Sequence, residues 1–100
     1  MELRHDDNEL ARVEFDPNYS GGFAESVVRA FRKVMNIIRN VQNESELYHW
    51  RGLRFEKLKG NKSHQHSLRL NDQWRLIVEI EHRSGSNSNI CVVKDIEDYH

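Results

Sequence analysis

The segment FAESVVRAFRKVMNIIRNV, residues 23–41, carries the strongest periodic signal in the sequence. Its apolar residues recur three or four positions apart, with charged and amide side chains on the opposite side, which is the pattern of an amphipathic helix. About 19 residues make a helix roughly 28 Å long, which is enough to cover one face of a small sheet. Beyond it, Asn43 followed by Glu46 resembles a helix-capping pair, so ESELYHW, residues 44–50, is expected to form a short second helix.

On the C-terminal side of this helix the hydrophobic period changes to two, which indicates strands. Four segments show the alternation: LRFEKL, HSLRLN, WRLIVEIEH and ICVVKDI, which begin at residues 53, 66, 74 and 90. The connections between them are short, so neighbouring strands are expected to be antiparallel. Together they predict a sheet that buries one face against the long helix.

The residues before the long helix complete the expected sheet. LARVEF, residues 10–15, alternates apolar and charged positions and is expected to be a strand, whereas residues 1–9 form a polar arm. The fold class that follows is α+β: an antiparallel sheet of four to five strands, with one long helix and a short second helix packed on one face. Residues 1–100 are expected to form a single domain, in which 10–50 hold the strand and helices and 51–100 hold the antiparallel strands that carry the site.

The composition is that of a soluble globular protein, with 37% hydrophobic and 31% charged residues and no apolar run long enough to cross a membrane. The start, MELRHDDNEL, is too acidic and polar for a signal peptide, so a cytoplasmic location is expected. Cys91 is the only cysteine, which excludes an internal disulfide and a CxxC metal site. The glycine-rich nucleotide-binding patterns and the common hydrolase motifs are also absent, so no small-molecule cofactor and no metal are expected.

Positive charge is concentrated in one part of a nearly neutral chain. The formal net charge is −1, yet residues 51–75 hold seven Lys and Arg against two acids, a local net charge of +5. Such a patch suits short-range contact with a phosphate backbone better than long-range capture of nucleic acid. An ordinary solvated face is the alternative, and charge alone does not separate the two.

The segment HSLRLNDQWRL, residues 66–76, contains a pair of arginines that ought to repel each other. Its three leucines share the buried face only if the turn is centred on Asp72, and Arg69 then lies directly opposite Arg75 on the other face. Like charges in a direct cross-strand pair are destabilising. They are tolerated where an acid such as Glu79 lies alongside, and they are favoured where the pair binds an anion, because arginine forks match phosphate oxygens.

Three blocks, LKG at 58–60, SLRLNDQWRL at 67–76 and DYH at 98–100, occur in an order and spacing that resembles the HigB-like branch of the RelE/ParE toxin superfamily. The resemblance implies a toxin of a type II toxin–antitoxin system, a ribosome-dependent endoribonuclease that cleaves mRNA by attack of the ribose 2′-OH, without a metal. The partners it implies are a cognate helix-turn-helix antitoxin, the ribosome and mRNA. ParE-like relatives on the same fold instead inhibit DNA gyrase without catalysis, which leaves gyrase inhibition as the alternative function.

The resemblance also assigns roles to individual residues. The implied catalytic residues are Lys59, Arg69, Arg75, Asp98, Tyr99 and His100. The cations are implied to hold the phosphate, the acid and the imidazole to transfer protons, and the phenol to stack on a base or contact the ribose. The basic turn supplies the substrate-binding candidates Lys57, Lys62, His64 and His66. Some relatives carry a histidine where this chain has Glu56, which makes Glu56 a candidate acid or base.

Strand parity and turn length lead to a spatial prediction. The residues expected to converge on one concave surface, on the sheet face away from the 23–41 helix, are Lys59, Arg69, Arg75, Asp98 and His100. A metal site is not expected, although His64 and His66 lie on one side of an extended segment where two imidazoles can chelate a metal. No third ligand lies near them in sequence, and metal sites need three or four convergent donors.

Overall fold

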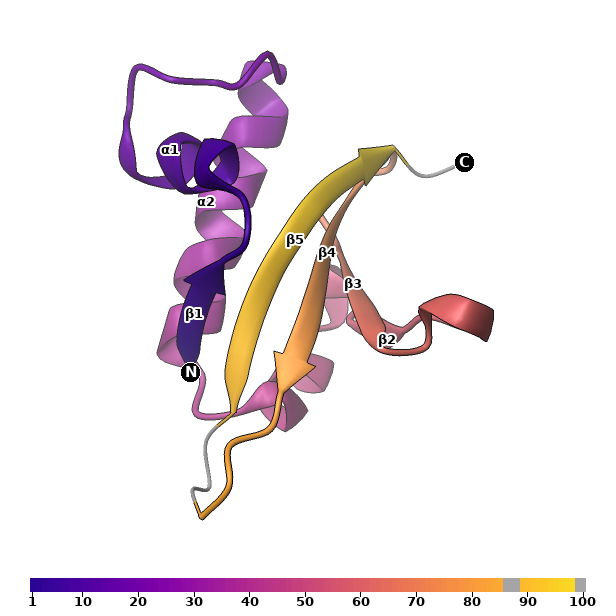
Figure 1. Cartoon of the computed structure of the whole chain (residues 1–100). Coiled ribbons are helices and arrows are strands. Elements are labelled where there is room, and N and C mark those ends of the chain that lie inside the picture. The colour runs from indigo at the N-terminus through magenta and orange to yellow at the C-terminus, as the bar shows by residue number, and fades with distance from the viewer. Residues whose placement is uncertain (86–88, 99–100) are drawn as a thin grey trace.

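The computed structural model describes residues 1–85 and 89–98, and within these ranges five strands form one sheet beside two α-helices (Figure 1). The strands are β1 (Glu2–His5), β2 (Glu56–Lys57), β3 (Gln65–Arg69), β4 (Trp74–Glu81) and β5 (Ile90–Asp98). The helices are α1 (Asn8–Phe15) and α2 (Glu25–Asn40), together with the short 3₁₀ helices η1 (Glu44–His49), η2 (Arg51–Leu53) and η3 (Gly60–Lys62). The strand order across the sheet is β1-β5-β4-β3-β2, which confirms the α+β class.

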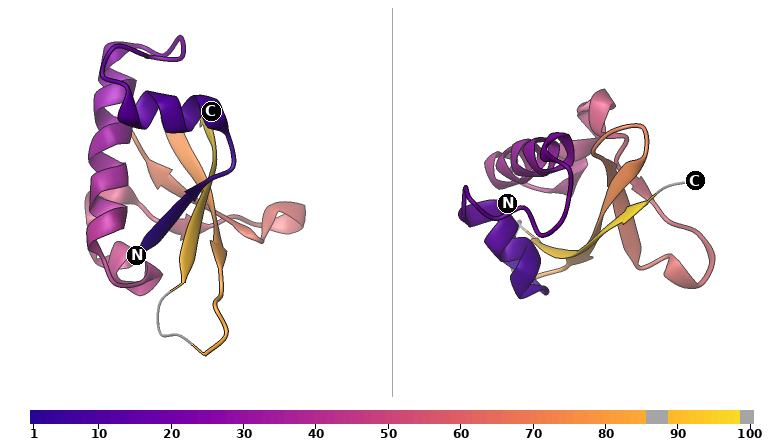
Figure 2. Two further views of the ribbon diagram at one scale, coloured as in Figure 1. Left: turned by 60° about the vertical axis from the view of Figure 1, so that its left-hand side comes forward. Right: turned by 90° about the horizontal axis from the view of Figure 1, so that it is seen from above.

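Helix α2 covers one face of the sheet, as the pattern over residues 23–41 predicts. Its buried residues are Val27, Val28, Phe31, Val34, Met35 and Ile38. In the same hydrophobic core they meet the sheet residues Leu68, Leu76, Val78, Cys91, Val93 and Ile96. Removal of this apolar stripe from water is the main force that holds helix and sheet together. Figure 2 shows α2 along the sheet, with α1 packed across α2.

The expected short second helix is present as the 3₁₀ helix η1. The side-chain oxygen of Asn43 accepts a hydrogen bond from the Ser45 backbone N–H at 3.1 Å. The Glu46 carboxylate reaches back and accepts from the Gln42 backbone N–H at 2.8 Å. These reciprocal bonds satisfy backbone donors at the start of the helix, as the capping pattern predicts.

Residues 10–15 are part of helix α1 rather than a strand, so that prediction is wrong. Asp7 caps the helix, because its carboxylate accepts a hydrogen bond of 2.7 Å from a backbone N–H in the first turn. Leu10 and Val13 are buried at helical spacing, whereas Phe15 is 65% exposed. Six residues are too few to separate a period of two from a helical period, and the cap favours the helix.

Residues 1–9 are more than a polar arm, because they contain strand β1 at one edge of the sheet. β1 pairs in parallel with β5, with Leu3 opposite Cys91 and His5 opposite Val93. The sheet is therefore mixed rather than wholly antiparallel, which corrects the sequence-based expectation. A strand of four residues with charged side chains has little of the apolar alternation by which strands are recognised.

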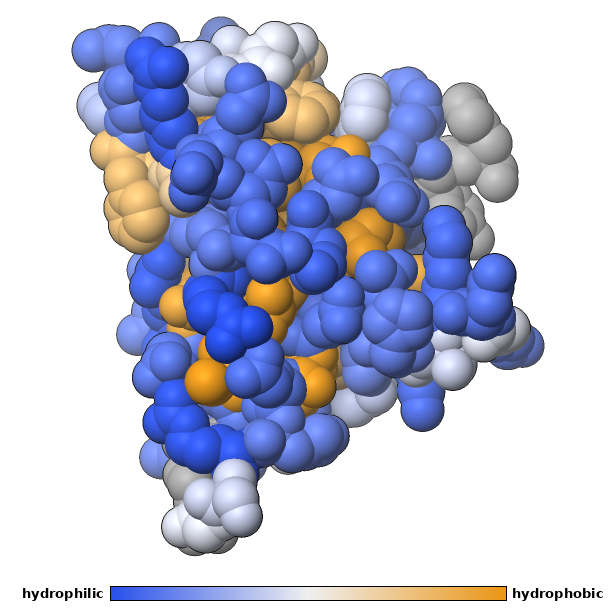
Figure 3. Space-filling view, viewed as in Figure 1, coloured by the Kyte–Doolittle hydropathy of each residue, from blue (hydrophilic) through white to orange (hydrophobic). Residues whose placement is uncertain are grey.

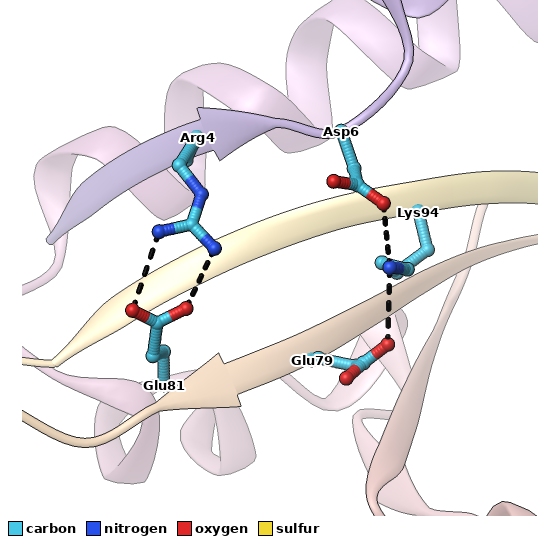
Figure 4. Close-up of polar contacts among 5 residues, drawn as sticks. All are labelled: Arg4, Asp6, Glu79, Glu81 and Lys94. Atoms are coloured by element: carbon cyan, nitrogen blue, oxygen red, sulfur yellow. Dashed lines mark hydrogen bonds and ion pairs between the residues drawn. The ribbon is translucent and has the colours of Figure 1, made fainter.

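Ion pairs join β1 to its neighbours on the face of the sheet away from α2 (Figure 4). The Arg4 guanidinium donates two hydrogen bonds, of 2.6 and 3.2 Å, to the Glu81 carboxylate. Lys94 Nζ lies 2.6 Å from Asp6 and 3.4 Å from Glu79, so it connects the end of β1 to β4. Exposed ion pairs contribute little stability each, and their main effect here is to fix the register of a polar edge strand.

A second charged cluster joins β1, α1 and α2 on the helix side of the sheet. The Glu14 carboxylate accepts hydrogen bonds from Arg39 at 2.9 and 3.0 Å and lies 2.7 Å from His5 Nε2. Burial acts to raise the pKa of Glu14, but the hydrogen bonds from Arg39 and His5 outweigh it and hold the pKa below its ordinary value. The ionised carboxylate therefore stabilises the packing of the three elements.

Glu14→Gln is expected to destabilise the protein by about 1.5–3 kcal/mol at neutral pH, the range for a hydrogen bond to a charged group. A lowered folded-state pKa stabilises the fold above the unfolded-state pKa of about 4.3, and this contribution disappears as the pH falls through the folded-state pKa. The difference between variant and wild type in the free energy of unfolding, measured by urea titration, should therefore narrow from pH 6 to pH 3. A difference that stays constant over this range contradicts the assignment.

Strands β3, β4 and β5 lie where the alternation predicts them, whereas β2 is shorter than the segment LRFEKL. Only Glu56 and Lys57 pair with β3, because the chain before them turns through η2 and Arg54 adopts a left-handed conformation with φ 45°. In the pairing of β4 with β5, Ile77 is opposite Asp95 and Val78 is opposite Val93, so Lys94 is the extra residue of a bulge. In the described ranges, no helix combines the length and apolar character that a membrane crossing requires.

Candidate functional site

The hairpin between β3 and β4 determines the positions of both arginines. Arg69 pairs directly with Arg75 across the two strands, which confirms the predicted register. Asn71 fixes the turn, because its side-chain oxygen accepts hydrogen bonds from the backbone N–H groups of Gln73 at 2.9 Å and Trp74 at 2.8 Å. An asparagine that bonds to the backbone two residues further on favours a tight turn.

The register places both arginines on the sheet face away from α2. Successive side chains of a strand point to opposite faces, and the neighbouring Leu68 and Leu76 are fully buried in the core beneath the helix. Trp74 is on the helix side as well, where it packs edge-on against Phe23 with 5.8 Å between the ring centroids. The arginine pair therefore belongs to the other, open face.

The two arginines are held in different ways. Arg75 is only 9% exposed, and its Nη1 donates hydrogen bonds to the backbone carbonyl oxygens of Asn71 at 2.6 Å and Trp74 at 3.3 Å. Arg69 is more exposed and forms an ion pair with Asp72 in the turn. Arg75 is thus fixed by the backbone of its own hairpin, whereas the Arg69 guanidinium is held by an exposed side chain.

Asp72 is the acid that offsets the arginine pair. The hydrogen bond from Arg69 is the main cause that lowers the pKa of Asp72, and the charges of Arg69, Arg54 and Arg75 act in the same direction. Glu79, the acid that strand parity suggests for this role, lies 3.4 Å from Lys94 instead. The carboxylate of Asp72 therefore occupies a position in which an external anion would contact Arg69.

Asp72→Asn is expected to strengthen the binding of a short single-stranded RNA about two- to fivefold, because it releases the Arg69 guanidinium from a weak, exposed ion pair. Fluorescence anisotropy at fixed salt measures the dissociation constant. Glu25→Gln is the matched control, since Glu25 is an exposed acid paired with Arg29 on α2, the helix that covers the opposite face of the sheet from the arginine pair. Equal affinities for Asp72→Asn and wild type contradict a phosphate-binding role for Arg69.

The acid opposite Arg75 on β5 is Glu97. The register pairs Glu97 with Arg75 and Asp98 with Trp74, so Asp98 lies on the helix side of the sheet, at the end of the strand. Asp98 Oδ2 accepts a hydrogen bond from Gln73 Nε2 at 3.1 Å. The expectation that Asp98 shares a face with the arginines is therefore not met. Glu97, which is not among the residues predicted from sequence, lies opposite Arg75 instead.

Next to the arginines, two buried residues line the same sheet face. Ser67 and Ile77 are cross-strand partners on β3 and β4, with 3% and 4% exposure. Glu56 on β2 pairs with Ser67 and therefore lies on this side too, where it is exposed. We call this surface the arginine face; its members are Glu56, Ser67, Arg69, Arg75, Ile77 and Glu97.

The basic turn forms an arm that extends from the sheet on the side away from α1 and α2 (Figures 1 and 2). The arm comprises β2, η3 and the residues up to β3. Its exposed basic residues are Lys57, Lys59, Lys62 and His64. The structure thus brings the two arginines together and places the lysines on a neighbouring projection. His100 of the expected convergent site lies outside the described residues, and so does Tyr99, which the resemblance implies to be catalytic.

His66 is packed rather than presented on the arginine face. Its cross-strand partner is Val78 of the core, and its ring stacks on Phe55 with 4.7 Å between centroids and 8° between planes. Burial is the main cause that lowers the pKa of His66, and the charge of Lys57 adds to it, so the imidazole is neutral at neutral pH. Among the described residues no group of three or more His, Cys, Asp or Glu side chains is arranged to hold a metal.

Comparisons with known proteins agree with this architecture. One family model, described as the RelE-like toxin of type II toxin-antitoxin system HigB, matches residues 3–100. Among solved structures, a YoeB/ParE toxin from Agrobacterium tumefaciens is similar with a TM-score of 0.63, at 17% sequence identity and with 100% of both chains covered. At that identity the likeness shows the fold alone. A search of curated proteins found no match.

Proposed function

This chain belongs to the HigB family of RelE-like toxins of type II toxin–antitoxin systems, and we propose that it is an endoribonuclease that cleaves mRNA on the ribosome. The observation that carries the proposal is the direct pairing of Arg69 with Arg75 on the open face of the sheet. Glu56 lies on the same face, across Ser67. Cations beside a carboxylate are the groups that cleavage of a phosphodiester by its own ribose requires.

The proposed reaction proceeds without a metal. A base removes the proton from the ribose 2′-OH, the 2′-oxygen forms a bond to the adjacent phosphorus, and the bond between phosphorus and the 5′-oxygen breaks. A proton donor protonates the departing 5′-oxygen. The products are a 2′,3′-cyclic phosphate on the upstream fragment and a 5′-OH on the downstream fragment.

The arginines stabilise the negative charge that develops on the phosphate oxygens in the transition state. Arg75 is suited to this role because backbone carbonyls already hold its guanidinium, so little reorganisation accompanies the reaction. Arg69 contributes a second guanidinium once the phosphate has replaced Asp72 as its ion-pair partner. Glu56 is the base in this proposal, since it is the exposed acid on β2 that faces the same side as the arginines.

The remaining candidates belong to residues 98–100 and to the arm. In the proposal His100 is the proton donor to the 5′-oxygen and Tyr99 stacks on a base of the mRNA, while Asp98 joins the end of β5 to the hairpin turn through Gln73. The exposed cations of the arm contact the mRNA or ribosomal RNA backbone, and they are Lys57, Lys59, Lys62 and His64. The face seen in Figure 1 is mainly hydrophilic, with hydrophobic residues in small separate areas (Figure 3).

The purified protein, added to a bacterial translation extract with a defined mRNA, tests the proposal. We expect cleavage inside the translated region, only while ribosomes translate it, with a cyclic phosphate on the upstream fragment. That end group separates the proposed chemistry from metal-dependent hydrolysis, which leaves a 5′-phosphate on the downstream fragment. Intact mRNA together with inhibition of purified DNA gyrase in a supercoiling assay contradicts the proposal and supports the ParE-like alternative.

A further inference from the structure

The sheet narrows to β3, β4 and β5 at the end where the β3–β4 hairpin turns. β1 pairs with β5 only as far as Val93, and β2 pairs with β3 only as far as Ser67. Beyond these residues, one row of cross-strand partners runs from Glu97 on β5 through Arg75 on β4 to Arg69 on β3. Directly opposite residues share a face, so this row places one carboxylate beside two guanidinium groups.

Glu97 differs from the acids of β4 on the same side of the sheet. Glu81 is paired with Arg4, and Glu79 is paired with Lys94 (Figure 4). The Glu97 side chain is partly exposed, and in the described part of the chain its carboxylate forms no hydrogen bond or ion pair. Its oxygens can therefore accept hydrogen bonds from a ligand that lies on the arginine face.

A carboxylate next to a phosphate-binding arginine pair repels the phosphate itself, so the ligand must offer it a hydrogen-bond donor. In RNA the ribose 2′-OH is the donor that accompanies every phosphate whatever the sequence, and it is the group that distinguishes RNA from DNA. We propose that Glu97 accepts a hydrogen bond from a ribose 2′-OH and makes the arginine face selective for RNA over DNA. This inference rests on the proposed function, because it takes the arginine pair as the site of an RNA phosphate.

The register also indicates which ribose Glu97 contacts. Glu97 is next to Arg75 on the β5 side of the arginine pair, whereas Glu56 is on β2, diagonal to Arg69 on the other side. The two riboses joined by a phosphate likewise lie on opposite sides of it, and the nucleophilic 2′-OH belongs to the upstream one. With Glu56 as the base for the upstream ribose, Glu97 contacts the ribose of the downstream nucleotide, whose 5′-oxygen departs.

The test compares a short RNA with the same sequence built from 2′-deoxynucleotides, uracil retained, by fluorescence anisotropy at fixed salt. The wild type should bind the RNA about tenfold more tightly than the deoxy strand, the lower end for a hydrogen bond to a charged group. Glu97→Ala should reduce this preference to about threefold or less, although loss of the negative charge strengthens the binding of both strands. Glu97→Gln keeps a neutral acceptor and should give an intermediate preference.

Asp95→Ala is the matched control, because Asp95 is an exposed acid on the same strand and the same face, opposite Ile77 rather than an arginine. It removes the same charge as Glu97→Ala and should leave the preference for RNA at the wild-type value. A single 2′-deoxy nucleotide then assigns the contact to one ribose. On programmed ribosomes, this substitution directly downstream of the cut should slow cleavage by the wild type about tenfold, and should not slow cleavage by Glu97→Ala.

Equal affinity of the wild type for the two strands, or a preference that Glu97→Ala leaves unchanged, overturns the proposal. An effect of Glu97→Ala that follows the cytosine content of the strand rather than its sugar also overturns it, since the donor is then a base amino group. Equal slowing of both proteins by the downstream substitution overturns the assignment to that ribose. If mRNA on ribosomes stays intact while Glu97→Ala still loses its preference for RNA, the proposed function fails and the ribose contact stands. A wild type that binds neither strand overturns both.

Discussion

Arg75→Ala is expected to lower the rate of ribosome-dependent mRNA cleavage by about 10²–10³, the range for removal of one preorganised donor that faces a developing negative charge. The side chain is nearly buried and is fixed by two backbone carbonyl oxygens of its own hairpin. Its position therefore does not depend on the substrate, and its loss is not compensated by rearrangement. The rate constant of a single-turnover cleavage on programmed ribosomes, followed by primer extension, measures the effect.

Two further variants complete this test: one keeps the charge at position 75 but changes its geometry, and the other is a control. Arg75→Lys keeps a cation but loses the planar fork, so its cleavage rate should lie between those of wild type and Arg75→Ala. Arg83→Ala is the matched control, because Arg83 is an exposed arginine two residues after the end of β4, at the opposite end of that strand from Arg75, where it pairs with Glu2. Its rate should stay within about twofold of wild type. A loss of similar size in Arg83→Ala, or none in Arg75→Ala with an unchanged melting temperature, contradicts the assignment.

The hairpin could be predicted from sequence because two independent constraints, the turn and the burial of the leucines, fix the same register. A tight turn fixes which residues are opposite each other, and a shift by one position would expose every leucine of the pair of strands. The pairing of Arg69 with Arg75 follows from this constraint without knowledge of the rest of the fold. The long helix was equally predictable, since its apolar stripe extends over four turns and only one face of α2 is buried.

The N-terminal part could not be predicted in the same way. The segment 10–15 is short enough to fit either period, and the helix is favoured by Asp7, which lies outside the segment. The register of β1 is fixed by charged partners that are about eighty positions away in sequence, such as Glu81 for Arg4. Long-range ion pairs leave no periodic trace in a single sequence, so a polar edge strand resembles a disordered arm.

The position of Asp98 was missed because of the bulge in β5. Val93 and Ile96 are both buried although they are three positions apart, an odd spacing that a regular strand cannot place on one face. That spacing is visible in the sequence and is the signal that predicts an extra residue, Lys94, between them. With the bulge included, Glu97 is opposite Arg75, and Asp98 is on the helix side.

Phe31→Ala is expected to lower the free energy of unfolding by about 3–5 kcal/mol, the cost of removing a fully buried aromatic ring from a core. Phe31 has no exposed surface and lies in the middle of α2, on the stripe that packs against the sheet. A domain of this size has a total stability of about 5–15 kcal/mol, so the variant loses a large share of it. Urea unfolding followed by far-ultraviolet circular dichroism measures the change.

Phe15→Ala is the matched control for Phe31→Ala, because Phe15 is 65% exposed. Its ring is edge-on to that of His5, with 6.0 Å between the centroids, and the Arg39 guanidinium carbon lies over it at 5.3 Å. Loss of the Phe15 ring should lower the free energy of unfolding by less than about 1 kcal/mol.

Because α2 supports the sheet from the face opposite the arginines, Phe31→Ala should reduce toxicity by lowering the amount of folded protein, while the cleavage rate per folded molecule stays near that of wild type. Arg75→Ala should give the reverse, with folded protein at the wild-type level and slow cleavage. A Phe31→Ala protein that is as stable as Phe15→Ala contradicts the core assigned to α2.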